Sequence, residues 1–281
     1  MEIKMKQLKN AIHLLQTQTN IQHESFVITT ADSHVIVVDG GHRADAPYLI
    51  DYLRSVTGED VPHVDAWIIT HAHNDHTDAF FEIIENHSAC VDIGGVYYNL
   101  PSVQYFENGS PDAVETAKEF YSLLPRFAER AHIVFGGDVY EFGAAKIEFL
   151  YTPDYEITEN RANNSSLVFK LTLGEKTALF LADAGIEAGD KLLKKYKGTG
   201  ILHCDVCQMA HHGQAGVSRE FYEEVRPEIC LWCAPRWLWE NDFGKGFNSF
   251  VFKTVEVRGW MEALGVKKNY VDMDGTQICP M

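Results

Sequence analysis

The feature that most constrains this chain is the polar stretch Thr70–Asp78, which holds three histidines and two aspartates in nine residues. It directly follows the apolar run Ala66–Ile69, which predicts a buried strand. His71 and His73 are two residues apart, so in an extended segment their side chains point the same way. Asp75 and His76 come where the chain is expected to turn into a helix, and they reach a second point nearby. The spacing therefore favours a pair of metal ions over a single ion, and over a polar loop with incidental histidines.

Charge restricts the partners of the chain. Its 281 residues include 24 Lys plus Arg and 40 Asp plus Glu, which gives a formal net charge of −16. This excess opposes binding to long nucleic acid or to an anionic membrane, since both need a positive field. It leaves open a small-molecule anionic substrate, because bound metal ions reverse the sign of the charge locally. The sequence does not fix the oligomeric state.

The sequence is typical of a cytoplasmic protein. No run approaches the ~20 apolar residues of a membrane span. The stretch Met1–Leu8 has basic residues but no apolar block behind them, so we expect no signal peptide. Six cysteines in such a chain indicate reduced thiols.

Two Cys-x-x-Cys pairs, Cys204/Cys207 and Cys230/Cys233, resemble a structural zinc ribbon on paper. Both pairs lie in expected strands, where positions three apart point to opposite faces. Neither has the glycine-rich turn that a zinc knuckle needs. We therefore expect buried free cysteines.

The first half of the chain alternates strands and helices. Residues 10–40 predict a β-meander that ends in Asp39-Gly40-Gly41, which is either a tight turn beside a site or an ordinary strand-to-helix turn. Asp45 and Pro47 predict the start of a helix, and Gly58 its end.

Residues 99–131 are the least regular part of the sequence. Pro111 predicts the start of a helix of roughly 20 residues from Asp112 to Ala131. This helical insertion either covers the site or only connects two strands.

The second half carries further candidate residues at strand ends. Strands at 166–171 and 177–182 predict a hairpin, and Asp183 follows the second of them. A strand at 205–210 ends in His211-His212-Gly213. The aromatic loop from Pro235 to Phe252 either walls a pocket or, as we favour, packs in the core. Since no linker or repeat divides the chain, we expect one α+β domain over residues 1–281, with two face-to-face sheets and helices outside.

These motifs resemble the metallo-β-lactamase superfamily, whose fold is a four-layer αββα sandwich. The resemblance rests on Thr70-His71-Ala72-His73-Asn74-Asp75-His76, preceded by a strand pair that ends in Asp-Gly-Gly. Asp183 is similar to the carboxylate that bridges two metals in that family, and Met209–Gly213 is similar to the segment of its late histidine ligand. The resemblance covers roughly residues 10–279.

One departure indicates a branch of the superfamily. Many members carry a Gly-His-Thr-Pro-Gly segment whose histidine binds metal, but this chain has Arg161–Phe169, with Asn163-Asn164, in its place. The Asn-Asn-x-Ser-Leu-Val pattern with a later His-His-Gly resembles the hydrolase domain of ComEC-type DNA-uptake proteins and the phosphorylcholine esterases. Gln214 stands where that branch has Ser, although Ser218 follows shortly.

The resemblance implies two divalent metal ions. His71 and His73 would hold metal one; Asp75, His76 and His211 would hold metal two; Asp183 would bridge them. Asp75 and Asp183 are also the candidate catalytic carboxylates. A bridging water that loses its proton near neutral pH would be the nucleophile. Zinc fits such ligands best, and manganese or iron also fit.

Four further residues are candidates for substrate or supporting contacts. Asp39 would fix the tautomer of a metal-binding histidine. Asn163 or Asn164 would hydrogen-bond water or substrate at the open side of metal one, or would only cap a turn. His212 either supports the site or replaces His211 as ligand. Because adjacent residues on a strand cannot both point inward, we favour His211.

The expected activity is hydrolysis of a phosphodiester or another small phosphate-containing molecule, because two metals can face both the attacking and the leaving oxygen. Hydrolysis of an ester, thioester or lactone on the same site is an alternative. A non-catalytic metal-binding module is a further one.

Overall fold

Two β-sheets form the centre of the computed structural model, which describes residues 8–281. The first sheet has seven strands in the order β16-β1-β2-β3-β5-β7-β8. Their bounds are β1 Ala11–Leu14, β2 Ser25–Thr29, β3 Val35–Asp39, β5 Ala66–Ile69, β7 Val96–Tyr98, β8 Ala131–Ile133 and β16 Gln277–Pro280. The first three strands are antiparallel neighbours, which confirms the predicted meander.

The second sheet also has seven strands, in the order β15-β14-β13-β12-β11-β10-β9. Their bounds are β9 Val139–Phe142, β10 Ala145–Tyr151, β11 Val168–Leu173, β12 Lys176–Phe180, β13 Val206–Gln208, β14 Ile229–Trp232 and β15 Lys268–Val271. A small separate pair joins β4 (His63–Val64) to β6 (Asp92–Ile93).

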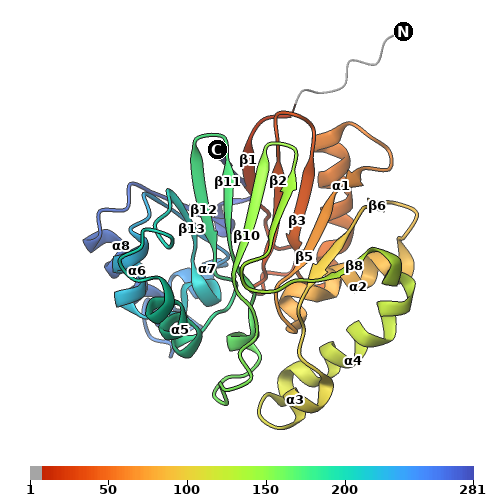
Figure 1. Ribbon diagram of the computed structural model, residues 1–281. Coiled ribbons are helices and arrows are strands. Elements are labelled where there is room, and N and C mark those ends of the chain that lie inside the picture. The colour runs from red at the N-terminus through yellow and green to blue at the C-terminus, as the bar shows by residue number, and fades with distance from the viewer. Residues whose placement is uncertain (1–7) are drawn as a thin grey trace.

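Helices cover the outer face of each sheet, as Figure 1 shows. The first sheet is covered by α1 (Ala46–Thr57), α2 (Asn74–Asn86) and α4 (Val114–Leu123), and the second by α5 (Ile186–Tyr196), α6 (Arg219–Val225) and α8 (Thr254–Ala263). The short helices α3 (Val103–Glu107) and α7 (Arg236–Trp239) lie in the connections. The predicted α+β, four-layer αββα sandwich is therefore confirmed.

The alternation of side chains along β3 explains this layering. Val35 and Val37 pack under the helices of the first sheet, while Ile36 and Val38 pack between the two sheets. Successive side chains on a strand point to opposite faces, so a strand covered on both faces must be apolar throughout. This is why the chain shows apolar runs rather than alternation.

Local signals placed some elements correctly and one incorrectly. Helix α1 begins after Asp45 and ends at Gly58, whose φ of 78° is left-handed, as predicted. The predicted 20-residue helix from Asp112 to Ala131 is wrong, because α4 ends at Leu123 and two short 3₁₀ turns follow. Pro125 lacks the amide hydrogen that a continuing helix needs.

The six cysteines are free, and the four in Cys-x-x-Cys pairs are buried, as expected. Across residues 8–281, no helix combines the length and the apolar character that crossing a membrane requires. The prediction that no signal peptide is present falls mainly on residues 1–7, which lie outside the described residues.

The topology brings several strand ends to one edge of the sandwich. β3 and β5 run parallel, and so do β12, β13, β14 and β15. The carboxyl ends of parallel strands meet at the same edge, where polar loops can converge. Each of the predicted ligand segments follows one of these ends.

Candidate metal centre

The first half of the site is the turn between β5 and α2. His71 and His76 are fully buried, and His73 stands at the N-cap of α2. Nε2 of His71 lies 3.1 Å from Nδ1 of His73. The two rings therefore approach each other through nitrogens rather than through carbon edges.

Hydrogen bonds fix which nitrogens of these rings carry protons. The hydroxyl of Thr70 donates to Asp39 Oδ2 at 2.7 Å, so it can only accept from His71 Nδ1 at 3.1 Å. His76 Nδ1 donates to Asp39 Oδ2 at 2.7 Å, and His73 Nε2 donates to the carboxylate of Asp112 at 3.0 Å. In the neutral form of each ring, which is the form that binds metal, the remaining nitrogens, Nε2 of His71 and His76 and Nδ1 of His73, therefore present lone pairs to the site.

Asp183 reaches the same point from the other sheet. It follows β12 and is 1% exposed. Its Oδ2 lies 3.7 Å from His71 Nε2 and its Oδ1 lies 3.4 Å from His76 Nε2. The carboxylate thus stands between two imidazole nitrogens, as a bridging ligand would.

The late His-His-Gly segment corrects a premise of the sequence analysis. His211 and His212 lie in a tight turn, not on a strand, and both have left-handed backbone, with φ of 51° and 54°. Both side chains consequently face Asp183, with Nε2 to Oδ2 distances of 3.7 Å and 3.6 Å. The argument that only one of them can point inward is therefore wrong.

Of these two histidines, His212 is the more deeply placed. It is fully buried, and its Nε2 is 3.1 Å from Asp75 Oδ2. Asp75, His76 and His212 form a group whose potential ligand atoms all lie within 4.8 Å of one another, as do His71, His76 and Asp183. His211 has a side chain 20% exposed and lies at the rim. The geometry therefore favours His212, rather than His211, as the histidine of metal two.

Burial and mutual attraction set the charges of this cluster. Burial raises the pKa of the Asp183 carboxyl, but His212, His76 and His211 outweigh it and hold that pKa well below its usual range. Burial lowers the pKa of His212, but Asp183 and Asp75 raise it to about 9. Protons on the histidines thus balance the buried carboxylates, and metal binding would release such protons.

Several buried atoms at the centre lack a partner. Within the described chain, His76 Nε2, His212 Nε2 and Asp183 Oδ1 make no hydrogen bond of normal geometry, and their polar contacts given above are ion pairs at 3.1–3.6 Å. Buried polar atoms without partners are rare and costly. Imidazole nitrogens and carboxylate oxygens are also ligands that zinc and iron accept. The residues present therefore fit a metal centre.

Comparison with known proteins identifies the family of this chain. The family profile described as the metallo-beta-lactamase superfamily matches residues 19–233. The chain belongs to the metallo-β-lactamase superfamily. A search of curated proteins gave no match.

Solved structures with a similar fold carry different chemistries. The metallo-beta-lactamase fold protein YhfI from Bacillus subtilis has 13% identity and a TM-score of 0.54, over 95% of this chain and 99% of that one. Zn²⁺-bound PqqB from Methylobacterium extorquens has 9% identity and a TM-score of 0.56, over 92% and 88%. CmlA, a diiron β-hydroxylase from Streptomyces venezuelae, has 12% identity and a TM-score of 0.58, over 98% of this chain and 55% of that one. This superfamily chain thus spans about half the length of the hydroxylase, and such low identities show the fold alone.

Two carboxylates accept hydrogen bonds from histidines of the centre, and the sequence analysis identified only one of them. Asp39 accepts hydrogen bonds from Nδ1 of His76 and from the amide of Thr70, as expected of a residue that fixes the tautomer of a histidine. Asp112 holds His73 from the inserted segment, although its side chain is 65% exposed. Nothing in the sequence distinguished Asp112 from other surface acids. The insertion therefore contacts the metal centre through this residue.

Glu24 is a further buried acid that sequence reasoning missed. It directly precedes β2 and is fully buried, and burial raises the pKa of its carboxyl to about 8. Its potential ligand atom groups with those of Asp183 and His212, within 4.8 Å. The only signal in the sequence was one acid at the start of an apolar run.

The two adjacent asparagines have different roles. Asn164 accepts hydrogen bonds from the amides of Gly185 and Ala188 at the start of α5, so it caps a helix rather than facing the metals. Asn163 lies 3.3 Å from His211 Nε2 through its Nδ2. His211 Nδ1 faces the carbonyl of Ala215, so its Nε2 accepts from Asn163. Asn163 and His211 thus form one edge of the site.

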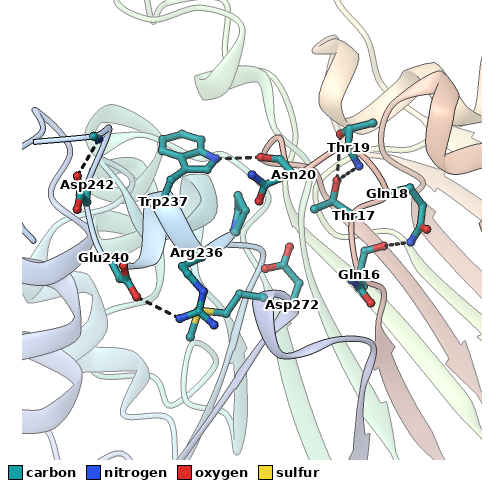
Figure 2. Close-up of a pocket in the computed structure, with 13 residues that line it drawn as sticks. Gln16, Thr17, Gln18, Thr19, Asn20, Arg236, Trp237, Glu240, Asp242 and Asp272 are labelled. Atoms are coloured by element: carbon teal, nitrogen blue, oxygen red, sulfur yellow. Dashed lines mark hydrogen bonds and ion pairs between the residues drawn. The ribbon is translucent and has the colours of Figure 1, made fainter. Parts of the chain in front are cut away.

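A pocket of about 710 Å³ opens at the same edge of the sandwich. It lies between residues 16–20, the start of α7 and the turn after β15, and Figure 2 shows Asp272 and Arg236 directed into it. Trp237 Nε1 donates to the carbonyl of Asn20 at 3.1 Å. Asp272, Glu240 and Asp242 give the lining more acidic than basic groups. The favoured prediction that the aromatic side chains of this loop pack in the core is wrong, because Phe243, Phe247 and Phe250 are exposed and Trp237 walls a pocket.

Proposed function

We propose that this protein is a dinuclear-metal-dependent hydrolase. His71, His73 and Asp183 would hold one ion, and Asp75, His76, His212 and Asp183 the other. Two bound ions would supply an activated water and stabilise the negative charge that develops in the reaction. Zinc is the metal we propose, and manganese and iron are the alternatives.

The observation that carries this proposal is the close approach of two lone pairs. His71 Nε2 and His73 Nδ1 are 3.1 Å apart, and both rings have their other nitrogen engaged as a donor. Two neutral imidazoles arranged in this way repel each other unless a proton or a metal ion stands between them. A metal ion at this point removes the repulsion and uses both lone pairs.

We propose that the open side of metal one receives the substrate. No histidine occupies the Gly-His-Thr-Pro-Gly position in the sequence, and Asn163 and His211 form that edge instead. The Nδ2 amide of Asn163, which His211 holds in place, is suited to orient an anionic oxygen. Such fixed polar groups lower a reaction barrier by positioning the substrate.

The substrate class that we propose is a phosphodiester or another small phosphate-containing molecule. Two metals can contact both the attacking and the leaving oxygen of phosphoryl transfer. The net charge of −16 disfavours long nucleic acid. If the pocket at the same edge of the sandwich receives the organic group beside the phosphate, its excess of acidic groups favours a neutral or cationic one. Such a preference would fit the phosphorylcholine-esterase-like branch.

Metal analysis and a substrate panel test this proposal together. Protein purified without chelator is expected to hold two metal ions per chain and to cleave bis-p-nitrophenyl phosphate or p-nitrophenyl phosphorylcholine. Asp183→Asn should abolish cleavage, while Asp51→Asn, at an exposed acid on α1, should not change it. Turnover of a lactone alone would contradict the phosphate assignment. Protein that binds no metal after reloading would overturn the proposal as a whole.

A further inference from the structure

Glu24 links the two halves of the site through its backbone. Its amide donates to the carbonyl of Asp75 at 2.9 Å, and its carbonyl accepts from the amide of Gly40 at 3.0 Å. These bonds tie it to the helix that carries Asp75 and to the turn after Asp39. The position of Glu24 is therefore fixed by the same elements that hold the first-half ligands.

The side chain of Glu24 crosses to the second sheet. Its Oε2 accepts from Gln208 Nε2 at 2.8 Å, and both residues are buried. Gln208 also accepts from the amide of Leu181 at 2.7 Å and donates to the carbonyls of Ala182 and Met209. Gln208 thus joins the strand ends that lead to Asp183 and to the two late histidines. The Glu24–Gln208 hydrogen bond therefore connects the two sheets close to the candidate metal centre.

The second carboxylate oxygen of Glu24 is not used by the hydrogen bond to Gln208. Among residues 8–281, Oε1 of Glu24 has no hydrogen-bond partner, and neither has Nδ1 of His212. One carboxylate oxygen of Glu24 lies within 4.8 Å of one of the two ring nitrogens of His212 and of a carboxylate oxygen of Asp183. The side chains of Glu24 and His212, each of which carries a buried polar atom without a hydrogen-bond partner, are thus neighbours.

His76 shows what a completed arrangement looks like in the same site. Its Nδ1 donates to Asp39 at 2.7 Å, and its Nε2 faces Asp183 Oδ1 at 3.4 Å. On the side that faces the centre, His212 resembles His76, because its Nε2 also faces a carboxylate oxygen, Asp75 Oδ2, at 3.1 Å. A metal-bound histidine almost always donates its other N–H to an acceptor, which fixes its ring and strengthens it as a ligand. For His212, that acceptor is missing unless Glu24 provides it.

We propose that Glu24 is the positioning residue of His212, accepting its Nδ1–H when a metal occupies the Nε2 side. Asp39–His76 and Glu24–His212 would then be two carboxylate–histidine pairs at metal two, with both carboxylates supplied by the first sheet and His212 by the second. This inference rests on the proposed metal centre. Loss of such a partner lowers metal affinity by about 10- to 100-fold.

Cobalt substitution provides the test, because Co²⁺ shifts the NMR signals of the imidazoles that bind it. The intact protein loaded with Co²⁺ is compared with Glu24→Gln, Asp39→Asn and the control Glu141→Gln, an exposed acid on the distant strand β9. Each exchangeable imidazole N–H held by an acceptor should give a shifted signal. Glu24→Gln should move or remove one signal, Asp39→Asn a different one, and Glu141→Gln none.

Affinity for Co²⁺, measured by competition with a chelator, gives a second readout. Glu24→Gln should lose about 10- to 100-fold at one of two sites, while Glu141→Gln keeps the wild-type values. If Glu24→Gln fails to fold, Glu24→Asp keeps the charge but withdraws it, and a smaller loss at the same site is expected. Wild-type signals and affinity in the folded Glu24 variant would overturn this inference alone. A wild-type protein that binds no Co²⁺ would instead overturn the metal centre.

Discussion

Replacing Gly213 with alanine tests why a glycine must follow the two late histidines. Gly213 has a φ of 77°, and a Cβ there would overlap the Cζ3 and Cε3 atoms of Trp232. That indole cannot retreat easily, because it is fully buried and its Nε1 donates to Asn269 at 2.8 Å. The substitution therefore combines backbone strain with a collision in the core.

Gly58 supplies the control for the backbone part alone. It has nearly the same φ, 78°, and no atom of the described chain lies within 4 Å of a Cβ placed there. Gly58→Ala should cost only the left-handed conformation, about 1 kcal/mol. Gly213→Ala adds overpacking of about 1–3 kcal/mol, so its total loss should be about 2–4 kcal/mol.

Urea unfolding of the chelator-treated protein measures both losses without interference from bound metal. The two variants should have similar m-values and different midpoints, with Gly213→Ala less stable by at least about 1 kcal/mol. Because Gly213 follows His212 directly, this variant should also bind metal more weakly, whereas Gly58→Ala should not. If the two alanine variants unfold at the same urea concentration, the steric argument is refuted.

Three further substitutions test the acids around the site. Asp39→Asn should destabilise the chelator-treated protein by about 2 kcal/mol, because His76 loses a charged acceptor; an unchanged urea midpoint would contradict this. Asp112→Asn should change stability by less than about 1 kcal/mol, since the pair is exposed, but should weaken metal binding about tenfold through His73, and chelator competition would show it. Burial raises the pKa of Asp272 from 3.8 to about 6, so the folded state keeps its proton longer than the unfolded state and loses stability as the pH rises through this range. The loss is about 3 kcal/mol, and Asp272→Asn should remove it; parallel wild-type and variant profiles of unfolding free energy between pH 4 and 7 would argue against a buried acid of this kind.

Helix α1 and helix α4 show where local signals suffice. The early Pro47 and the left-handed Gly58 act within one turn of the chain, so the bounds of α1 were predictable. The predicted cap by Asp45 is wrong in its mechanism, because the Asp45 carboxylate accepts from the amides of His42 and Gln18 rather than from α1. For α4, Pro125 was an available local signal that the predicted long helix disregarded. The failure was therefore one of interpretation and not of missing information.

The two late histidines show where local signals do not suffice. A strand of alternating side chains was the natural expectation for the end of β13, but His211 and His212 both adopt left-handed backbone. That turn is held by contacts between distant segments, such as the His211 amide with the Ala182 carbonyl at 2.8 Å. No pattern within the segment encodes such a contact.

The sequence by itself determined the kinds of ligand, their order, and their places after buried strands, because apolar runs and turn residues act over a few positions. These patterns predicted two face-to-face sheets with helices outside, and the resemblance to the metallo-β-lactamase superfamily implied the αββα sandwich and the convergence of Thr70–Asp78 with Asp183. Only the tertiary structure decided which atoms face each other. Packing of the two sheets sets His212 against Asp75 and brings Glu24 beneath Asp183, while the insertion sets Asp112 against His73. Such pairings depend on residues far apart in the chain, and distances between them are fixed only when the layers pack.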